Sequence, residues 1–150
     1  MNLFDQISAD IKSAMLAKDK MRLEALRNVK KYFLEAKTAP GANDTLSDEA
    51  ALKIIGKLVK QGKDSAQIYS DQKRPELAES ELAQVSVYES YLPKQLSTEE
   101  LEIELKKIIT LVGASGLQDL GKVIGGATKA LSGKAEGRVI SETAKRLLQQ

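Results

Sequence analysis

The last third of the chain combines basic side chains with an unusual number of glycines, and this combination can bind a polyanion. From Leu105 to Gln150 there are eight basic and three acidic residues. Ammonium and guanidinium groups neutralise phosphates without reading a base sequence, and the binding weakens steeply with salt. We predict that six residues of this region contact nucleic acid. They are Lys122, Lys129, Lys134, Arg138, Lys145 and Arg146.

Glycines in the same region can let a ligand approach the main chain closely, because they carry no Cβ. We predict this role at Gly121, Gly125, Gly133 and Gly137. Gly133 is also expected to end one helix in the left-handed conformation, and Gly137 to begin the next. A helix that starts there, beside Lys134 and Arg138, is a candidate phosphate seat.

Each of these features also has a purely structural interpretation. Gly121 and Gly125 lie four residues apart on one helix face, a spacing that equally serves tight packing against another helix. The basic residues can be the solvated faces of surface helices. The sequence leaves both alternatives open.

Catalysis is restricted by what the chain lacks. It contains no His and no Cys, so it has no imidazole base, no thiol nucleophile and no zinc site of the usual kinds. The glycines around Lys122 follow neither the dinucleotide nor the P-loop pattern, and no strand precedes them. Carboxylates at Glu76, Glu79, Glu81 and Glu89 fit helix solubility better than acid–base chemistry. We therefore expect no catalytic residue, no metal and no cofactor.

Composition also gives an expectation for the compartment. The absence of Cys fits a reducing environment. The opening residues lack the basic-then-apolar order of a signal peptide, and no apolar run approaches the ~20 residues that a spanning helix needs. We expect a cytoplasmic protein with no membrane partner.

Apolar residues recur at spacings of three and four along nearly the whole chain, which predicts an all-α fold. Their pattern indicates about four helices before Pro93 and a smaller three-helix unit after it. In the fourth helix the predicted buried stripe includes Ala78, Leu82 and Val85. No useful stretch shows the alternation of a strand.

The stretch "YLPKQLS", Tyr91–Ser97, predicts the boundary between these two parts. Proline disfavours helix both at its own position and at the residue before it. Ser97 or Thr98 can then cap a new helix, and the acidic residues that follow suit its positive end. We predict an N-terminal helical subdomain of residues 1–92 and a basic C-terminal subdomain of residues 93–150.

A narrow apolar seam between Leu52 and Tyr69 is typical of a helix that packs along one neighbour. Gly62 interrupts it at a cost of about 1 kcal/mol relative to Ala, unless another element approaches closely there. If this seam is partly exposed, the N-terminal helices can dock a protein partner.

Several motifs together resemble the YqeY family of small bacterial proteins. In chain order they are "DIKSAMLAKDKMRLEALR" from Asp10, "KQGKDSAQIY" from Lys60, "ELAESE" from Glu76, "ESYLPKQLS" from Glu89, "DLGKVI" from Asp119 and "GKAEGR" from Gly133. That family is similar to the tail domain of the B subunit of glutamine-dependent aminoacyl-tRNA amidotransferase. Two positions depart from the family pattern: Gly62 stands where a basic residue is usual, and Ile124 where Met is common.

The resemblance implies an all-helical protein of two subdomains whose tail leans on the folded body of a tRNA. By position, Lys122, Lys134 and Arg138 match the residues expected to contact RNA. We expect a non-catalytic module that binds tRNA or a complex of the tRNA-amidotransferase type. Two alternatives remain, a protein–protein adaptor and an accessory of the amidotransferase. The carbon–nitrogen ligase activity associated with the family is attributed to shared domain ancestry, not to this chain alone.

Overall fold

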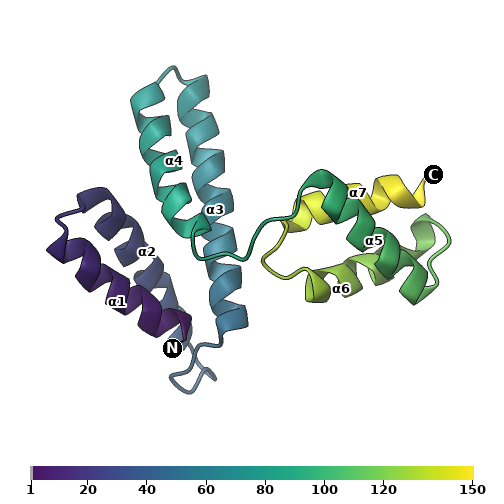
Figure 1. Ribbon diagram of the computed structural model, residues 1–150, viewed down its shortest axis with the longest axis horizontal. Helices are drawn as coiled ribbons and strands as arrows, with labels where there is room; N and C mark the ends of the chain where they lie inside the picture. Colours follow the sequence, from purple (N-terminus) through teal and green to yellow (C-terminus); the bar gives the residue numbers. More distant parts are fainter. Residues whose placement is uncertain (1) are drawn as a thin grey trace. The chain divides into compact units, whose positions relative to one another are not determined.

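The computed structural model describes residues 2–150, and all regular secondary structure in that range is helical (Figure 1). In chain order the elements are α1 (Leu3–Leu16), α2 (Lys20–Lys37), α3 (Asp48–Asp71), α4 (Pro75–Glu89), α5 (Thr98–Val112), the 3₁₀ helix η1 (Leu117–Asp119), α6 (Leu120–Ala130) and α7 (Gly137–Leu148). The all-α class predicted from the apolar periodicity is confirmed.

The chain divides into two compact units, and the division falls between Leu92 and Pro93. Helices α1–α4 belong to the first unit, and α5–α7 with η1 belong to the second. Between the units, α4 ends at Glu89 and α5 begins at Thr98. The Leu-Pro pair therefore lies in a non-helical segment, as the missing N–H and the steric restriction before proline require.

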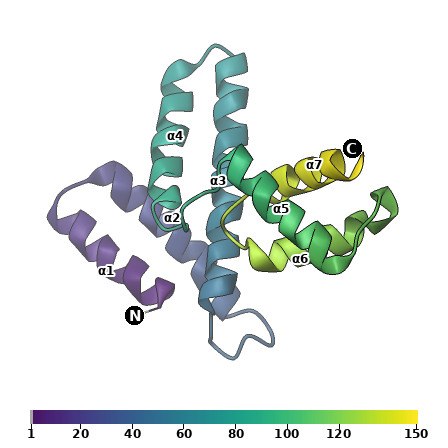
Figure 2. The same cartoon turned by 45° about the vertical axis from the view of Figure 1, so that its right-hand side comes forward.

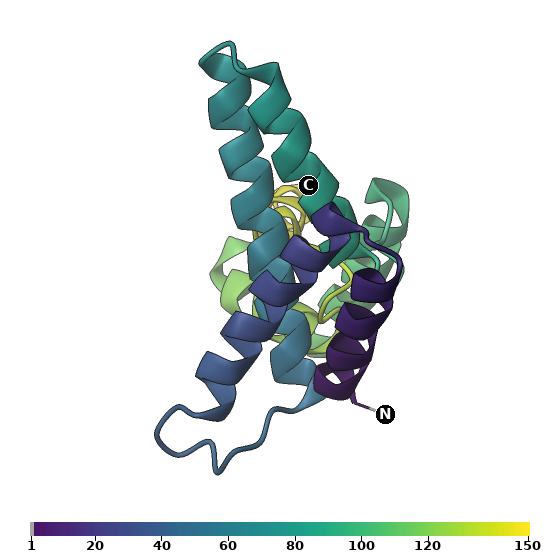
Figure 3. The same ribbon diagram turned by 90° about the vertical axis from the view of Figure 1, so that its left-hand side faces the viewer.

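In the first unit, α3 and α4 form an antiparallel hairpin whose helices lie side by side (Figures 1 and 3). Gly62 sits at their contact. A Cβ added to Gly62 would lie 2.4 Å from Cγ2 of Val85, a distance that real Cβ atoms do not show. The close approach proposed for Gly62 is therefore present, and its partner is α4.

The middle of the apolar seam of α3 is buried, and α4, α2 and α1 all pack against this helix. Ile55, Val59, Gly62 and Ala66 are all buried. Leu52 and Tyr69, at the two ends of the seam, are partly exposed. The middle of the seam is therefore closed to a protein partner, and only its ends keep some exposed surface.

One residue of the predicted stripe in α4 is not buried. Ala78, Val85 and Tyr88 are buried, but Leu82 is 47% exposed. The prediction of Leu82 as a core residue is wrong because α4 packs on two helices, α3 and α2. The buried face that results runs through Val85 and Tyr88 and leaves Leu82 at its edge.

Two tyrosines connect the end of α4 to the first two helices. Asn28 Nδ2 of α2 donates to the hydroxyl of Tyr88 at 3.0 Å. The hydroxyl of Tyr91 donates to Asp10 Oδ2 of α1 at 2.5 Å. Burial and the Asp10 carboxylate raise the pKa of Tyr91 above its ordinary value of 10.0, so the hydroxyl keeps its proton and remains a donor. These bonds fix the last residues of the first unit.

The second unit is a three-helix arrangement around its own apolar core (Figure 2). The fully or largely buried residues are Leu101, Leu105, Ile108, Val123, Ala127, Leu131, Ile140 and Ala144. Ser97 and Glu100 form a reciprocal capping box at the start of α5. Gly113 ends that helix with φ of 69°, in the left-handed region. The start of α5 thus uses Ser97, one of the two capping residues that the sequence predicted, and its end uses the conformational freedom of a glycine.

Candidate nucleic-acid interface

All six basic residues predicted to contact nucleic acid are exposed. Lys122 and Lys129 lie on α6, and Lys134 lies in the loop between α6 and α7. Arg138 is in the first turn of α7, and Lys145 and Arg146 are in its last turns. They come from two helices and one loop of a single unit.

Intramolecular ion pairs divide these six residues into two groups. Lys122 Nζ lies 4.0 Å from Asp119 Oδ1, and Arg146 pairs with Glu102 of α5. Lys129, Lys134, Arg138 and Lys145 form no ion pair within residues 2–150. Among the six, those four are the cations that have no ion-pair partner in the part of the chain that the structure describes.

Two glycines leave the main chain uncovered by side chains on the outward face of α6. Gly121 and Gly125 are exposed, and a Cβ added to either would meet no atom within 4 Å. The tight-packing interpretation is therefore wrong for these two residues. Lys122 and Lys129 lie on the same outward face, since Val123 and Ala127 occupy the buried one. Bare main chain and lysine side chains thus share one exposed helix face.

A third glycine, Gly126, has the packing role instead. A Cβ there would lie 3.3 Å from Cγ2 of Ile108 on α5. This packing role was not predicted from the sequence. The adjacent pair of glycines gave no indication of which one faces the core.

The loop before α7 has the conformation expected of its glycines. Gly133 has φ of 75°, which strains any L side chain, and Gly137 is the first residue of α7. Glu136 is the N-cap residue of that helix, and its side chain makes no capping hydrogen bond. The first N–H groups of α7 thus lie beside Lys134 and Arg138 in sequence, as the phosphate-seat hypothesis requires.

Lys94 is a further basic residue at this loop, and the sequence alone did not indicate it. Leu96 N–H donates to the carbonyl oxygen of Lys134 at 2.9 Å, and Gln95 Nε2 donates to that of Gly133 at 2.6 Å. These bonds hold the segment after Pro93 against the loop before α7. Lys94 is exposed there, and it helps to lower the pKa of Glu100, although the Ser97 N–H is the main cause. No pattern in the sequence pairs residues that are 38 positions apart.

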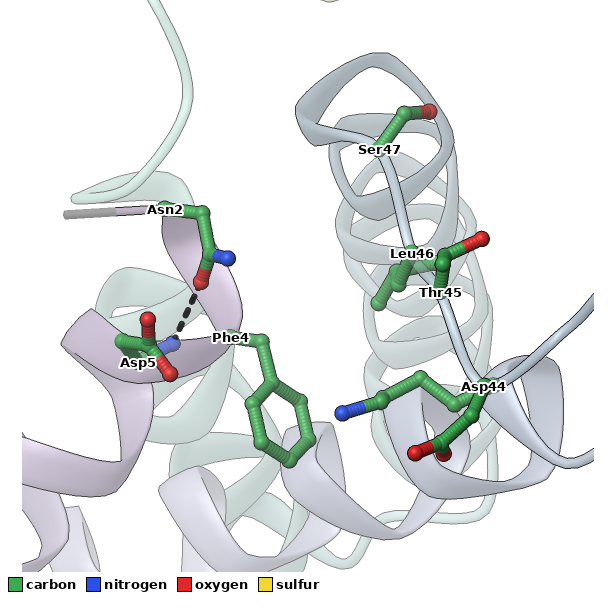
Figure 4. Close-up of a pocket in the computed structure, with 8 residues that line it drawn as sticks. Asn2, Phe4, Asp5, Asp44, Thr45, Leu46 and Ser47 are labelled. Carbon is green, nitrogen blue, oxygen red and sulfur yellow. Dashed lines mark hydrogen bonds between the residues drawn. The ribbon is translucent and has the colours of Figure 1, made fainter.

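A cavity of about 350 Å³ lies in the first unit, away from these residues in the chain (Figure 4). Its lining includes Phe4, Lys37 and Leu46, and Lys37 Nζ lies 4.1 Å from the centre of the Phe4 ring. Asn2 and Ser47, also in the lining, use their side chains to cap α1 and α3. The side chains of Asn2 and Ser47 thus have structural partners.

Within residues 2–150, no three His, Cys, Asp or Glu side chains gather as a metal ion would need. Among the described helices, none combines the length and the apolar character required to cross a bilayer.

Curated fungal proteins share sequence with most of the chain. One from Pyrenophora tritici-repentis is 28% identical over 131 residues, which cover 87% of this chain and 71% of that protein. One from Kluyveromyces lactis is 31% identical over 107 residues, which cover 69% of this chain and 57% of that protein. One from Vanderwaltozyma polyspora is 32% identical over 110 residues, covering 69% and 56% respectively. This chain therefore matches little more than half the length of the latter two relatives.

The name of these relatives corrects one prediction. Each is called "Altered inheritance of mitochondria protein 41, mitochondrial". The expectation of a cytoplasmic location is wrong on this finding. It depended on the lack of Cys and of a secretory signal, and neither absence separates the cytoplasm from other compartments that keep thiols reduced.

A comparison with family models agrees with the motifs described above. The model described as "Yqey-like protein" matches residues 4–148, which include both units and all six predicted contact residues. The chain belongs to the Yqey-like protein family.

Proposed function

We propose that this protein is a non-catalytic RNA-binding module that holds a folded RNA of the tRNA type through its second unit. The single observation that carries the proposal is that four of the six predicted contact residues, Lys129, Lys134, Arg138 and Lys145, are exposed and form no ion pair within residues 2–150. Placing unmatched like charges in one small unit opposes its folding. Phosphate groups of a ligand would remove that cost.

The outward face of α6 supports a ligand that approaches the main chain. Gly125 lies inside the helix, where it costs about 1 kcal/mol relative to Ala, and no neighbour among residues 2–150 needs the space. A ribose-phosphate backbone lying across α6 would use that space. Lys129, one turn further along the same face, would then reach a phosphate.

The type of RNA follows from the kind of contact available. The second unit has no aromatic residue on which an unstacked base could stack. Lysine and arginine contacts to phosphates recognise the shape of a duplex and not its bases. A folded RNA with a defined backbone path fits such a surface, and the resemblance to the amidotransferase tail domain favours tRNA.

The proposal is tested by charge reversal at the loop before α7. We expect Lys134→Glu with Arg138→Glu to weaken binding to a transcribed tRNA about tenfold or more, and to reduce the slope of log affinity against log salt by about two. Gel-shift titrations at two salt concentrations measure both quantities.

A matched control changes the same charge on another helix of the same unit. Lys106→Glu with Lys107→Glu alters two exposed residues of α5, which is not part of the proposed surface. This variant should retain most of the affinity. Equal losses in the two double variants, or an affinity that is indifferent to salt, would contradict the proposal.

A further inference from the structure

Helix α2 of the first unit carries an unmatched positive charge that the composition of that unit conceals. Residues up to Leu92 include equal numbers of basic and acidic residues, 14 of each. Six of the basic residues but only two of the acidic ones lie in the 18 residues of α2. The rest of the unit therefore has an excess of acidic residues. The net charge of zero arises from a basic α2 and an acidic remainder.

The basic residues of α2 concentrate within three turns of its C-terminal half. Arg27, Lys30 and Lys31 lie within one turn of one another, and Lys37 follows less than two turns later. Like charges at such spacings destabilise a helix. None of these four residues forms an ion pair in the part of the chain that the structure describes. We call Arg27, Lys30, Lys31 and Lys37 the α2 surface.

Three lysines of the α2 surface lie close to aromatic rings. Lys30 Nζ and Lys37 Nζ lie 6.0 Å and 4.1 Å from the centre of the Phe4 ring, and Lys31 Nζ lies 5.2 Å from that of Tyr32. Such contacts hold the side chains in place, and they leave the ammonium charge unneutralised.

The part of the α2 surface that bears Arg27 and Lys31 is not covered by its own unit, whereas Lys30 and Lys37 are half-buried. Ala25, Leu26, Val29 and Phe33 turn inward and are buried, whereas Arg27 and Lys31 are exposed. In Figure 3, α2 crosses the near side of the first unit with α3 behind it. The carboxylates nearest along the chain are Glu24 and Glu35 on α2 itself, and Asp5 and Asp44 line the cavity that Lys37 also lines.

We propose that the α2 surface binds the phosphate backbone of RNA, as a second contact separate from the one in the second unit. The occupant follows from charge and from composition. Protein interfaces have an apolar centre from which lysine is depleted, and the large exposed hydrophobic residue of this half of α2 is Leu34 alone. A surface made of cations with little apolar area matches a polyanion, whose charge is spread along its length.

This inference extends the proposed function, since both contacts would bind the same class of ligand. Two weak contacts on one chain raise the overall affinity beyond that of either, because the second forms at a high effective concentration. The two contacts can nevertheless be removed separately.

The test uses the full chain and a transcribed tRNA in the same two-salt titration. Arg27→Glu with Lys31→Glu should weaken binding about tenfold and reduce the salt slope by about two. Lys53→Glu with Lys57→Glu is the matched control, because both residues are exposed on α3 of the same unit. The control should stay within about twofold of the unmodified protein. Thermal melting followed by circular dichroism checks that all variants remain folded.

Two results would overturn the inference. One is an affinity and slope in the α2 variant equal to those of the unmodified protein. The other is a loss of binding to phosphatidylglycerol vesicles in that variant with RNA binding intact, which would assign the surface to lipid. If the α2 variant loses RNA binding and Lys134→Glu with Arg138→Glu does not, the proposed function of the second unit fails and the α2 surface stands.

Discussion

Gln95 donates a hydrogen bond from Nε2 to the carbonyl oxygen of Gly133 at 2.6 Å, and this bond joins the first residues of the second unit to the loop that precedes α7. The neighbouring bond from Leu96 N–H to the carbonyl of Lys134 strengthens the connection. The loop that carries Lys134 is therefore held from both sides, by α7 and by the segment after Pro93. Lys134 therefore lies on a loop whose backbone is held in place.

Removing that bond should loosen the loop. We predict that Gln95→Ala lowers the free energy of unfolding by about 1 kcal/mol, the usual net contribution of one hydrogen bond. Denaturant titration measures the change. Gln149→Ala, at the exposed C-terminal end, serves as the control and should have no effect. A Gln95→Ala variant as stable as the control would show that the bond contributes nothing.

Two glycines of α3 should respond in opposite directions to the same substitution. Gly62→Ala places a methyl group against Val85, which is stiff and buried, so we predict a loss of about 1–3 kcal/mol of stability. Gly56→Ala meets no atom within 4 Å and should gain up to about 1 kcal/mol from helix propensity. Thermal or denaturant unfolding compares the two variants.

A second substitution at Val85 tests the cause of the first loss. Val85→Ala removes the methyl group that would clash with residue 62. The combined variant should therefore be more stable than the sum of the two single changes predicts. Strict additivity would mean that the Gly62 contact is not what limits the substitution.

Gly125 should separate stability from binding. Gly125→Ala adds a methyl group to an open helix face, so it should raise stability by up to about 1 kcal/mol. The same methyl group should weaken RNA binding, because it prevents close approach to the main chain. A stabilised variant that binds RNA as well as the unmodified protein would exclude contact at this face of α6.

The capping box of α5 makes stability depend on acidity. The Ser97 N–H that donates to Glu100 lowers the pKa of that carboxyl from its ordinary value of 4.5. Folding therefore favours the ionised form. The resulting stabilisation is complete above the unfolded-state pKa, is lost as pH falls through the lower folded-state pKa, and is absent when both states are protonated.

Comparison with Glu100→Gln isolates this effect. We predict that the difference in stability between the two proteins shrinks as pH falls below about 4.5. Melting temperatures recorded between neutral and strongly acidic pH measure it. A difference that stays constant over this range would mean that ionised Glu100 does not cap α5.

Much of the fold follows from local sequence. The Leu92-Pro93 break, the Ser97 cap and the left-handed Gly113 are each fixed by one or two residues, and the structure contains all three. The long-range pairs are different. Glu102 is 44 residues from Arg146, and which cation it pairs with depends on how α5 packs against α7.

One feature that the sequence did not reveal and one wrong prediction have related causes, a charge averaged over many residues and the pattern of one helix taken alone. The balanced charge of the first unit concealed the excess of basic residues on α2, because a sum over 92 residues takes no account of position. Leu82 was assigned to the core from the period of one helix, whereas burial of α4 is set by its two neighbours. Which residues of a helix are buried depends on how the helices pack, and the sequence of one helix does not determine that packing.

The most direct test of RNA binding by the second unit is an NMR titration of the ¹⁵N-labelled full chain with transcribed tRNA. The amide signals of glycines usually resolve well, and the chain has glycines both in the proposed contact region and outside it. We predict large shifts or broadening at Gly121, Gly125, Gly133 and Gly137, with little change at Gly56 and Gly62 of α3. Unperturbed signals from the first four glycines at saturating tRNA would contradict the account.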